Sequence, residues 1–264
     1  MNRQSSIRRN ASLEKANRLL LAFSEATPEL GVMDLARRVG LNKSTVSRFV
    51  ATLNQLGLLE RADDGKKYRL ALRVYELGML AVRHRPVFQH SERTLERMAE
   101  QTRETAAVAV LVDRDVVFLG KAEVNPGSPI VAGRRYPAAC CAAGKILLAT
   151  STFGGGEGAV REREAGELTA APGRSVASPR SAELARAREQ GWATDHEELF
   201  AGLASVAVPV VDRRGTVAGA LAIFGPAARV LAASPPASVP LLQRAAGDVS
   251  RRLGFRPGRI RLAV

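Results

Sequence analysis

The stretch that most constrains the fold is residues 31–72, GVMDLARRVGLNKSTVSRFVATLNQLGLLERADDGKKYRLAL. Its first part carries Leu35, Ala36 and Val39 at the spacing of one face of a helix. Gly40 follows and suits the positive φ of a tight turn, after which a second amphipathic segment begins. Two helices joined in this way, with a short hairpin after them, predict a winged helix-turn-helix, which places its second helix in a DNA major groove.

The second of these helices has two different faces. Asn42 is suited to cap its first turn, because its side chain can accept from a free backbone N–H. Apolar residues then form one stripe, and small hydroxyls and basic groups lie opposite. Such side chains reach base edges and phosphates without steric conflict, although an ordinary solvated helix face would also be polar. The predicted DNA contacts of this helix are Lys43, Ser44, Thr45, Ser47 and Arg48.

A basic hairpin after the helix strengthens the prediction. Gly57 ends the helix, and Asp63-Asp64-Gly65 is a hairpin turn signal between two short apolar segments. Three basic residues follow the turn and are predicted to meet phosphate, namely Lys66, Lys67 and Arg69. A helix-turn-helix with such a wing is a more specific signal than the helices alone.

Charge agrees with a polyanionic partner. The net charge is +13, and residues 1–85 hold 16 Lys or Arg against 8 Asp or Glu. The rest of the chain is also mildly basic, so charge supports the motif without identifying it. No apolar run approaches the roughly 20 residues that cross a bilayer, and the basic N-terminus has no apolar signal region. We therefore expect a cytoplasmic protein with no membrane partner.

Catalytic and metal-binding motifs are weak throughout. Cys140 and Cys141 are adjacent, which suits neither a relaxed disulfide nor a zinc site, and the chain has three histidines. We expect both cysteines to be small, apolar, buried residues, because free cysteine packs well in protein cores. Gly144-Lys145 lacks the Ser or Thr and the earlier glycine of a phosphate loop. These observations predict no enzyme activity, no metal and no cofactor.

Helical and alternating patterns mix in the second part of the chain and predict an α+β domain. Residues 153–178 contain GGGEG and are expected to be irregular, with one short helix. Over the whole chain, we expect helices outside the helix-turn-helix at residues 13–26, 74–83, 87–102, 140–149, 181–190 and 240–253. Strands are expected at residues 105–112, 116–122, 130–131, 205–211 and 216–224.

Motifs across both halves resemble the IclR family of bacterial transcriptional regulators. They are SLEKANRLLLAFSEA, LARRVGLNKSTVSRFVATLNQLGLLER, KYRLALRVYELG, AAGKILLA, GWATDHEE, VAVPVVDRRGTVAGAL and DVSRRLGF, and they cover roughly residues 8–255. The resemblance implies a winged helix-turn-helix domain (8–72), a linker helix (73–85), a GAF-like effector-binding domain (86–255) and a basic tail (256–264). It further implies an effector-responsive repressor that binds a palindromic operator in double-stranded DNA as a homodimer or homotetramer.

The resemblance also supplies an effector site. Carried over by position, its residues are Ala139, Cys141, Ala142, Ala143, Asp195, Ser205, Ala222 and Phe224. Sensors of small oxoacids in this family often have His and Cys at the positions of Ala139 and Ser205, and Ser at those of Ala222 and Phe224. Fewer donors hold a compact carboxylate poorly, because burying its charge then costs free energy.

We therefore expect a more apolar effector, an aromatic or acyl carboxylate, with Asp195 and Ser205 as polar anchors. In the alternative, Phe224 fills the pocket and the site is lost. Two other functions stay open at this point. One is an architectural nucleic-acid binder without an effector, and the other is an enzyme with an appended DNA-binding module.

Overall fold

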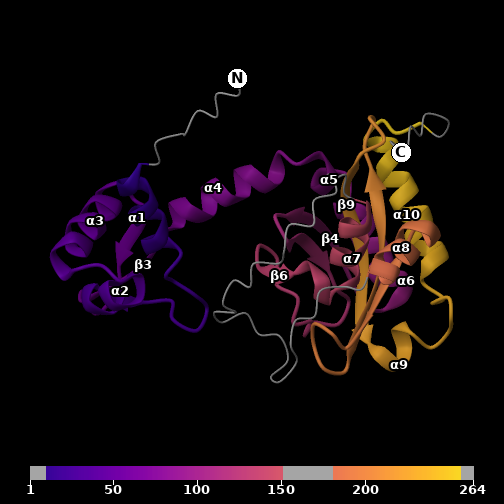
Figure 1. The fold of residues 1–264 in the computed structure, drawn as a ribbon, viewed down its shortest axis with the longest axis horizontal. Coiled ribbons are helices and arrows are strands. Elements are labelled where there is room, and N and C mark those ends of the chain that lie inside the picture. Colours follow the sequence, from indigo (N-terminus) through magenta and orange to yellow (C-terminus); the bar gives the residue numbers. More distant parts are fainter. Residues whose placement is uncertain (1–9, 151–180, 257–264) are drawn as a thin grey trace. The chain divides into compact units, whose positions relative to one another are not determined.

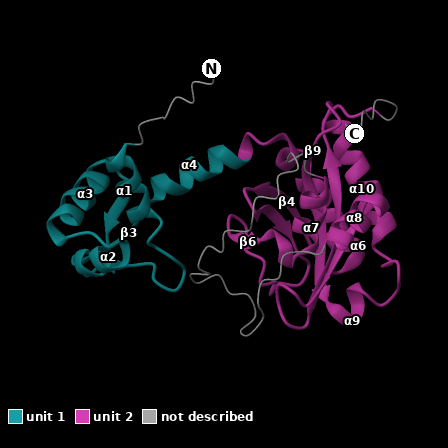
Figure 2. Ribbon diagram, viewed as in Figure 1, with its two compact units in different colours: residues 1–82 teal, residues 83–264 magenta. Residues whose placement is uncertain are grey.

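The computed structural model describes residues 10–150 and 181–256 (Figure 1). The chain divides into two compact units, residues 1–82 and 83–264 (Figure 2). The expected linker helix belongs almost wholly to the first unit. The irregular segment expected at residues 153–178 lies outside the described residues, as does the basic tail after Arg256.

The first unit is a helical cluster closed by a small antiparallel sheet of strand order β1-β3-β2. Its helices are α1 (Ala11–Leu20), α2 (Val32–Val39), α3 (Lys43–Gln55) and α4 (Leu72–Arg83). Its strands are β1 (Leu30–Gly31), β2 (Leu59–Arg61) and β3 (Lys67–Leu70). Leu19, Leu35 and Val46 are fully buried where α1, α2 and α3 meet. The apolar stripes of the sequence thus form this core.

Two features of this unit differ from the sequence prediction. The first helix ends at Leu20 and does not continue to residue 26, because Ser24 and Thr27 form a turn through paired backbone bonds. The strand β1 was not predicted. It is two residues long and pairs Leu30 with Tyr68 of the wing, too short to show alternation in the sequence.

The second unit is built on a six-stranded antiparallel sheet of order β6-β5-β4-β9-β8-β7. Its strands are β4 (Thr105–Val112), β5 (Asp115–Ala122), β6 (Arg135–Pro137), β7 (Ala193–His196), β8 (Leu203–Val211) and β9 (Val217–Pro226). Its helices are α5 (Pro86–Gln89), α6 (Glu92–Thr102), η1 (Ala138–Cys140), α7 (Ala142–Thr150), α8 (Ser181–Gln190), α9 (Ala227–Val230) and α10 (Val239–Arg252). The predicted α+β architecture is confirmed.

The two faces of the sheet have different partners. In β9, Ala222 and Phe224 belong to the core cluster that also contains Ala143 and Ile146 of α7. Since successive side chains of a strand point to opposite faces, Leu221 and Ile223 lie on the other face. There α6 and α10 contact each other and the central strands (Figure 1). The α7 face therefore carries the residues that the family resemblance assigns to the effector.

Two expectations for this unit are wrong. The helix expected at residues 87–102 is interrupted, and the Ser91 hydroxyl donates to the Val87 carbonyl at the break (2.6 Å). Residues 130–131 are not a strand, although Ile130 is fully buried. The edge strand is instead β6, where Tyr136 pairs with Val116. The apolar residue Ile130 suggested a strand, but it is apolar because it is buried in the core and not because it pairs in the sheet.

Candidate DNA interface and effector site

The start of α3 is shaped by a side-chain cap. The Asn42 side-chain oxygen accepts the Thr45 N–H (2.8 Å) and the Ser44 hydroxyl (3.0 Å). This confirms Asn42 as the N-cap of α3. Val46 and Val50 are buried beneath it.

The predicted base-reading residues lie on the exposed side of α3. Lys43, Ser44, Ser47 and Arg48 are exposed, and Thr45 is partly exposed. Among the described residues, neither Lys43 nor Arg48 has a carboxylate within ion-pair distance. Their cationic groups are therefore not neutralised within the unit, as a surface that meets phosphate requires.

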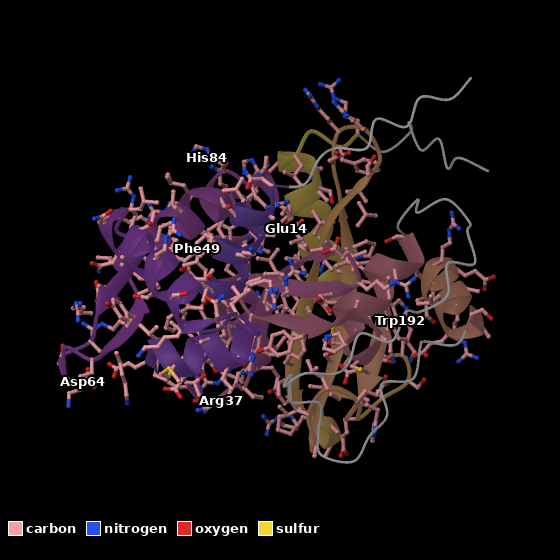
Figure 3. All side chains as sticks on the ribbon, turned by 60° about the vertical axis from the view of Figure 1, so that its left-hand side comes forward. Glu14, Arg37, Phe49, Asp64, His84 and Trp192 are labelled. Atoms are coloured by element: carbon pink, nitrogen blue, oxygen red, sulfur yellow. The ribbon has the colours of Figure 1, made fainter. Side chains whose placement is uncertain are left out.

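The wing is held by its acidic turn. The Asp64 carboxylate accepts the backbone N–H groups of Lys66 (2.8 Å) and Lys67 (3.0 Å). These hydrogen bonds, that of Lys67 first, lower the pKa of Asp64 below its ordinary value. Asp64 lies at the hairpin tip (Figure 3), where Lys66 and Lys67 are exposed beside it. The turn therefore presents two ammonium groups to solvent.

Arg69, the third basic residue predicted to contact phosphate, has a different environment. Its guanidinium lies 2.7 Å from Glu60, 3.7 Å from Asp63 and 3.8 Å from Glu29. The hydrogen bond to Glu60 raises the pKa of Arg69. Three carboxylates therefore surround a group that the sequence assigned to DNA.

Arg61, which the sequence reading missed, lies on the neighbouring strand β2. Its guanidinium donates to the Gly65 carbonyl (2.6 Å) and stacks over the Tyr68 ring, 5.2 Å from its centre. Nothing in the local pattern distinguishes it from any other strand arginine. It becomes visible only when β2 and β3 pair.

The residues carried over from the family resemblance come together on the α7 face. Ser205 of β8 lies opposite both Asp195 of β7 and Phe224 of β9. Its hydroxyl donates to the Asp195 carboxylate and accepts the N–H of Ala142 in the first turn of α7 (3.2 Å). We call Cys141, Ala142, Asp195 and Ser205 the inner cluster. The polar groups of Ala142, Asp195 and Ser205 therefore bond to one another.

Burial controls the electrostatics of the inner cluster. It raises the pKa of Asp195 to about 6, against the lowering effect of the Ser205 hydrogen bond. It also raises the pKa of the Cys141 thiol, which is fully enclosed. Cys140 and Cys141 are both buried, as predicted, and both are free thiols.

The Lys145 ammonium favours the charged form of Asp195 and so acts against the raising of its pKa. This ammonium lies 2.5 Å from Glu183 and 2.7 Å from Glu198, and it also donates to the Thr194 carbonyl. Burial disfavours its charge, but the bonds to both glutamates outweigh this and raise its pKa. Through these bonds Lys145 joins α7 to α8 and to the turn after β7, and its ammonium group already has its ionic partners.

Aromatic rings fill the space beside the inner cluster. Phe224 meets Phe118 edge to face with ring centres 5.3 Å apart, and Phe118 meets Tyr136 at 5.5 Å. Tyr136 in turn meets Phe200 at 6.1 Å. This packing favours the alternative in which Phe224 occupies the space that a compact effector would take.

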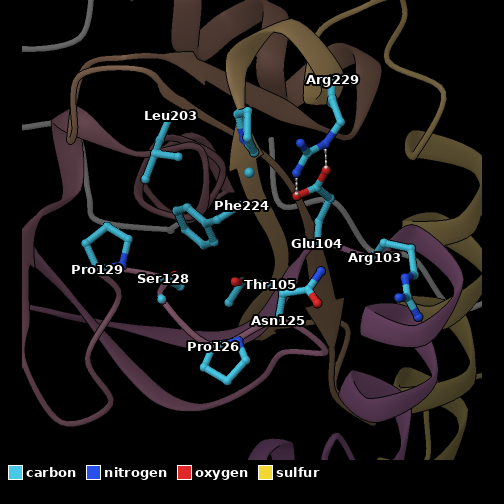
Figure 4. Close-up of a pocket in the computed structure, with 13 residues that line it drawn as sticks. Arg103, Glu104, Thr105, Asn125, Pro126, Ser128, Pro129, Leu203, Phe224 and Arg229 are labelled. Atoms are coloured by element: carbon cyan, nitrogen blue, oxygen red, sulfur yellow. Dashed lines mark hydrogen bonds and ion pairs between the residues drawn. The ribbon is translucent and has the colours of Figure 1, made fainter.

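A cavity of about 260 Å³, which we call the outer cavity, lies beside Phe224 (Figure 4). It is bounded by the ends of β4 and β9, the loop at residues 125–129, and Arg229 of α9. Of the eight residues carried over, Phe224 alone lines it. Arg103, Glu104 and Asn125 also line it, and no sequence motif announced them because they come from separate parts of the chain.

Within the described residues, no group of His, Cys, Asp and Glu could hold a metal ion. None of the helices described is both long and apolar enough to span a membrane.

An exposed recognition helix with a basic wing, joined to a domain with a ligand-sized cavity, defines a ligand-controlled, DNA-binding transcriptional regulator. Family models confirm both parts. The IclR helix-turn-helix domain matches residues 12–63, and the bacterial transcriptional regulator IclR C-terminal domain matches residues 79–251. The chain belongs to the IclR family.

Several known proteins are similar over nearly the whole chain. The HTH-type transcriptional regulator KdgR of Escherichia coli K12 is 30% identical over 93% of this chain and 93% of its own. XynR of the same strain is 31% identical over 92% of this chain and 97% of its own. An IclR homologue from Microbacterium hydrocarbonoxydans, crystallised with 4-hydroxybenzoate, is 29% identical with a TM-score of 0.73, over 92% and 99%.

Proposed function

We propose that this regulator is a repressor that binds a palindromic operator as a homodimer or as a homotetramer built from such dimers. The observation that carries the proposal is the outer face of α3, where Lys43 and Arg48 have no ionic partner among the described residues. Two recognition helices related by a two-fold axis would read half-sites about 34 Å apart. DNA as the target assigns the protein to the cytoplasm.

Within this interface we propose two kinds of contact. Lys43, Ser44, Thr45, Ser47 and Arg48 enter the major groove, where Arg48 and Thr45 read base edges. Lys66 and Lys67 of the wing bind phosphate and contribute affinity without sequence preference. Arg69 instead orients the wing through Glu60.

The second unit responds to a small apolar carboxylate, aromatic or acyl, and we propose no catalysis there and no cofactor. Support comes from the aromatic and aliphatic side chains around the cavity, Phe224 among them. The 4-hydroxybenzoate bound by a homologue is a ligand of this chemical class. Effector binding would change the arrangement of the recognition helices through α4, which requires different effector affinities in the two arrangements.

Selection from a pool of random duplexes tests the proposal. We expect enrichment of a two-fold symmetric sequence, and sedimentation of the selected complex should give two or four chains per site. Enrichment of no sequence, with affinity that depends only on salt, would indicate the architectural binder instead.

A further inference from the structure

The outer cavity has two chemically different sides. Figure 4 shows Arg103, Glu104, Asn125 and Arg229 on one side and Leu203, Pro129 and Phe224 on the other. Among the described residues, the lining includes two guanidinium groups and one carboxylate, which makes the charged side of this part of the chain net positive. A ligand with an apolar body and one negative group matches this division.

An ion pair fixes the charged side. Arg229 donates to both oxygens of Glu104, at 2.6 and 3.0 Å, and the Glu104 side chain is 10% exposed. Glu104 lies directly on Gly225, where an added Cβ would fall 2.1 Å from its carboxylate oxygen. Glycine therefore permits this placement, and Arg229 neutralises Glu104, the one acidic group that the described residues contribute to the lining.

Arg103 is the cation of the lining that stays available. It follows the last turn of α6 in the left-handed conformation (φ 59°), and its side chain has no ionic partner among the described residues. Asn125, from the loop at residues 125–129, adds an amide donor to the same side of the cavity. Charge-assisted hydrogen bonds from a guanidinium are among the strongest that a carboxylate can receive.

The inner cluster cannot offer the same. Ser205 donates to Asp195, and Lys145 is held by Glu183 and Glu198. A carboxylate placed there would meet the buried acid Asp195, and no residue that the structure describes would supply a free cation, so its burial would cost desolvation free energy. We expected from the sequence that Asp195 and Ser205 would anchor the effector. The cation that can compensate a carboxylate, Arg103, instead lines the outer cavity.

We propose that the outer cavity binds a single-ring aromatic monocarboxylate with its ring inward, against Phe224 and Leu203, and its carboxylate outward, on Arg103 and Asn125. The inference rests on the proposed function and makes Arg103 the residue that selects for the acid. Ring contact with Phe224 adds edge or offset stacking to apolar burial.

Calorimetric titration of the full-length protein with benzoate and with its neutral isostere benzamide tests the inference. Benzoate should bind more tightly than benzamide to the unaltered protein. Arg103→Gln should weaken benzoate binding roughly fivefold and abolish the preference over benzamide, as expected for a partly exposed ion pair. Arg103→Lys should keep part of the preference.

The matched control is Arg97→Gln, an exposed arginine of α6 away from the cavity, which should leave both affinities unchanged. Leu203→Trp should abolish binding of both ligands by filling the apolar side. Benzoate binding that survives Arg103→Gln in full would overturn the inference, as would no benzoate binding at millimolar concentration. Operator selection by the same samples would still support the proposed function in either case.

Discussion

The guanidinium of Arg69 lies 2.7 Å from the carboxylate of Glu60 on the adjacent wing strand. The same guanidinium is within 4 Å of Asp63 and Glu29. Three basic residues of one short segment therefore divide into two roles. Lys66 and Lys67 face solvent, whereas Arg69 ties the wing to β2 and to the segment before β1.

This division gives the first prediction. Lys67→Ala should lower the slope of log affinity against log salt by about 1, because one phosphate contact is lost. Arg69→Ala should leave that slope unchanged and instead lower the thermal stability of the wing. Fluorescence anisotropy of a labelled duplex over a salt series measures the slopes. A slope change for Arg69→Ala equal to that for Lys67→Ala would return Arg69 to the phosphate contacts.

Base reading by α3 gives the second prediction. Arg48→Ala should reduce the preference for operator over shuffled duplex by about 1–3 kcal/mol, because one base contact is removed. Competition binding with both duplexes measures the difference directly. Gln55→Ala, at the far end of the same helix and exposed, is the control. An Arg48→Ala protein with unaltered preference would mean that another face of the unit reads the bases.

The raised pKa of Asp195 gives a pH-dependent prediction. Its pKa is about 6 in the folded protein, against 3.8 for an ordinary aspartate, so the folded state holds the proton more tightly. The stability from that proton is complete below the unfolded pKa and is lost as pH rises through about 6. Relative to Asp195→Asn, which does not titrate, the unaltered protein should lose about 2 kcal/mol of unfolding free energy between pH 4.5 and 7.5.

Urea denaturation of both proteins across that range checks the difference. The constant offset from the altered bond to Ser205 cancels when the two pH values are compared. A difference that does not change with pH, or that changes in the opposite direction, would show that Asp195 is not buried as an acid.

The buried ammonium of Lys145 gives the fourth prediction. Its side chain is 2% exposed, whereas Glu183 and Glu198 are 43% and 38% exposed. Each single Glu→Gln change leaves one carboxylate in place, but the double change leaves a buried charge without compensation. The double variant should therefore lose about 3–5 kcal/mol, more than the two single losses together.

Adding Lys145→Met to the double variant is the control, because it removes the uncompensated charge and should restore much of the lost stability. A loss in the double variant equal to the sum of the two single losses would show that the three groups do not act as one cluster.

Local chemistry explains which features could be predicted from sequence. The bond from Thr45 to Asn42 spans three residues, and the Asp64 turn spans a similar distance, so both leave a pattern in the chain. Arg229 and Glu104 are 125 residues apart, and they meet only after β4 pairs with β9. A cavity formed by such long-range pairing has no local signature.

Gly144 has a structural role that also could not be predicted from the sequence. An added Cβ there would fall 2.0 Å from the Ala138 carbonyl oxygen, so the Gly-Lys pair serves close packing of η1 on α7. The sequence excluded a phosphate loop at this pair but gave no sign of the close approach. Tertiary contact, rather than phosphate, requires this glycine.

Sequence-specific DNA binding under effector control can be measured in a single titration. Anisotropy of a duplex from the region upstream of the gene would be measured against a shuffled duplex, with and without benzoate, at rising salt. We expect at least about a thousandfold preference for the natural duplex that persists as salt rises, and a change in that affinity when benzoate is added. Equal affinity for the two duplexes, unaffected by benzoate and falling together with salt, would contradict it.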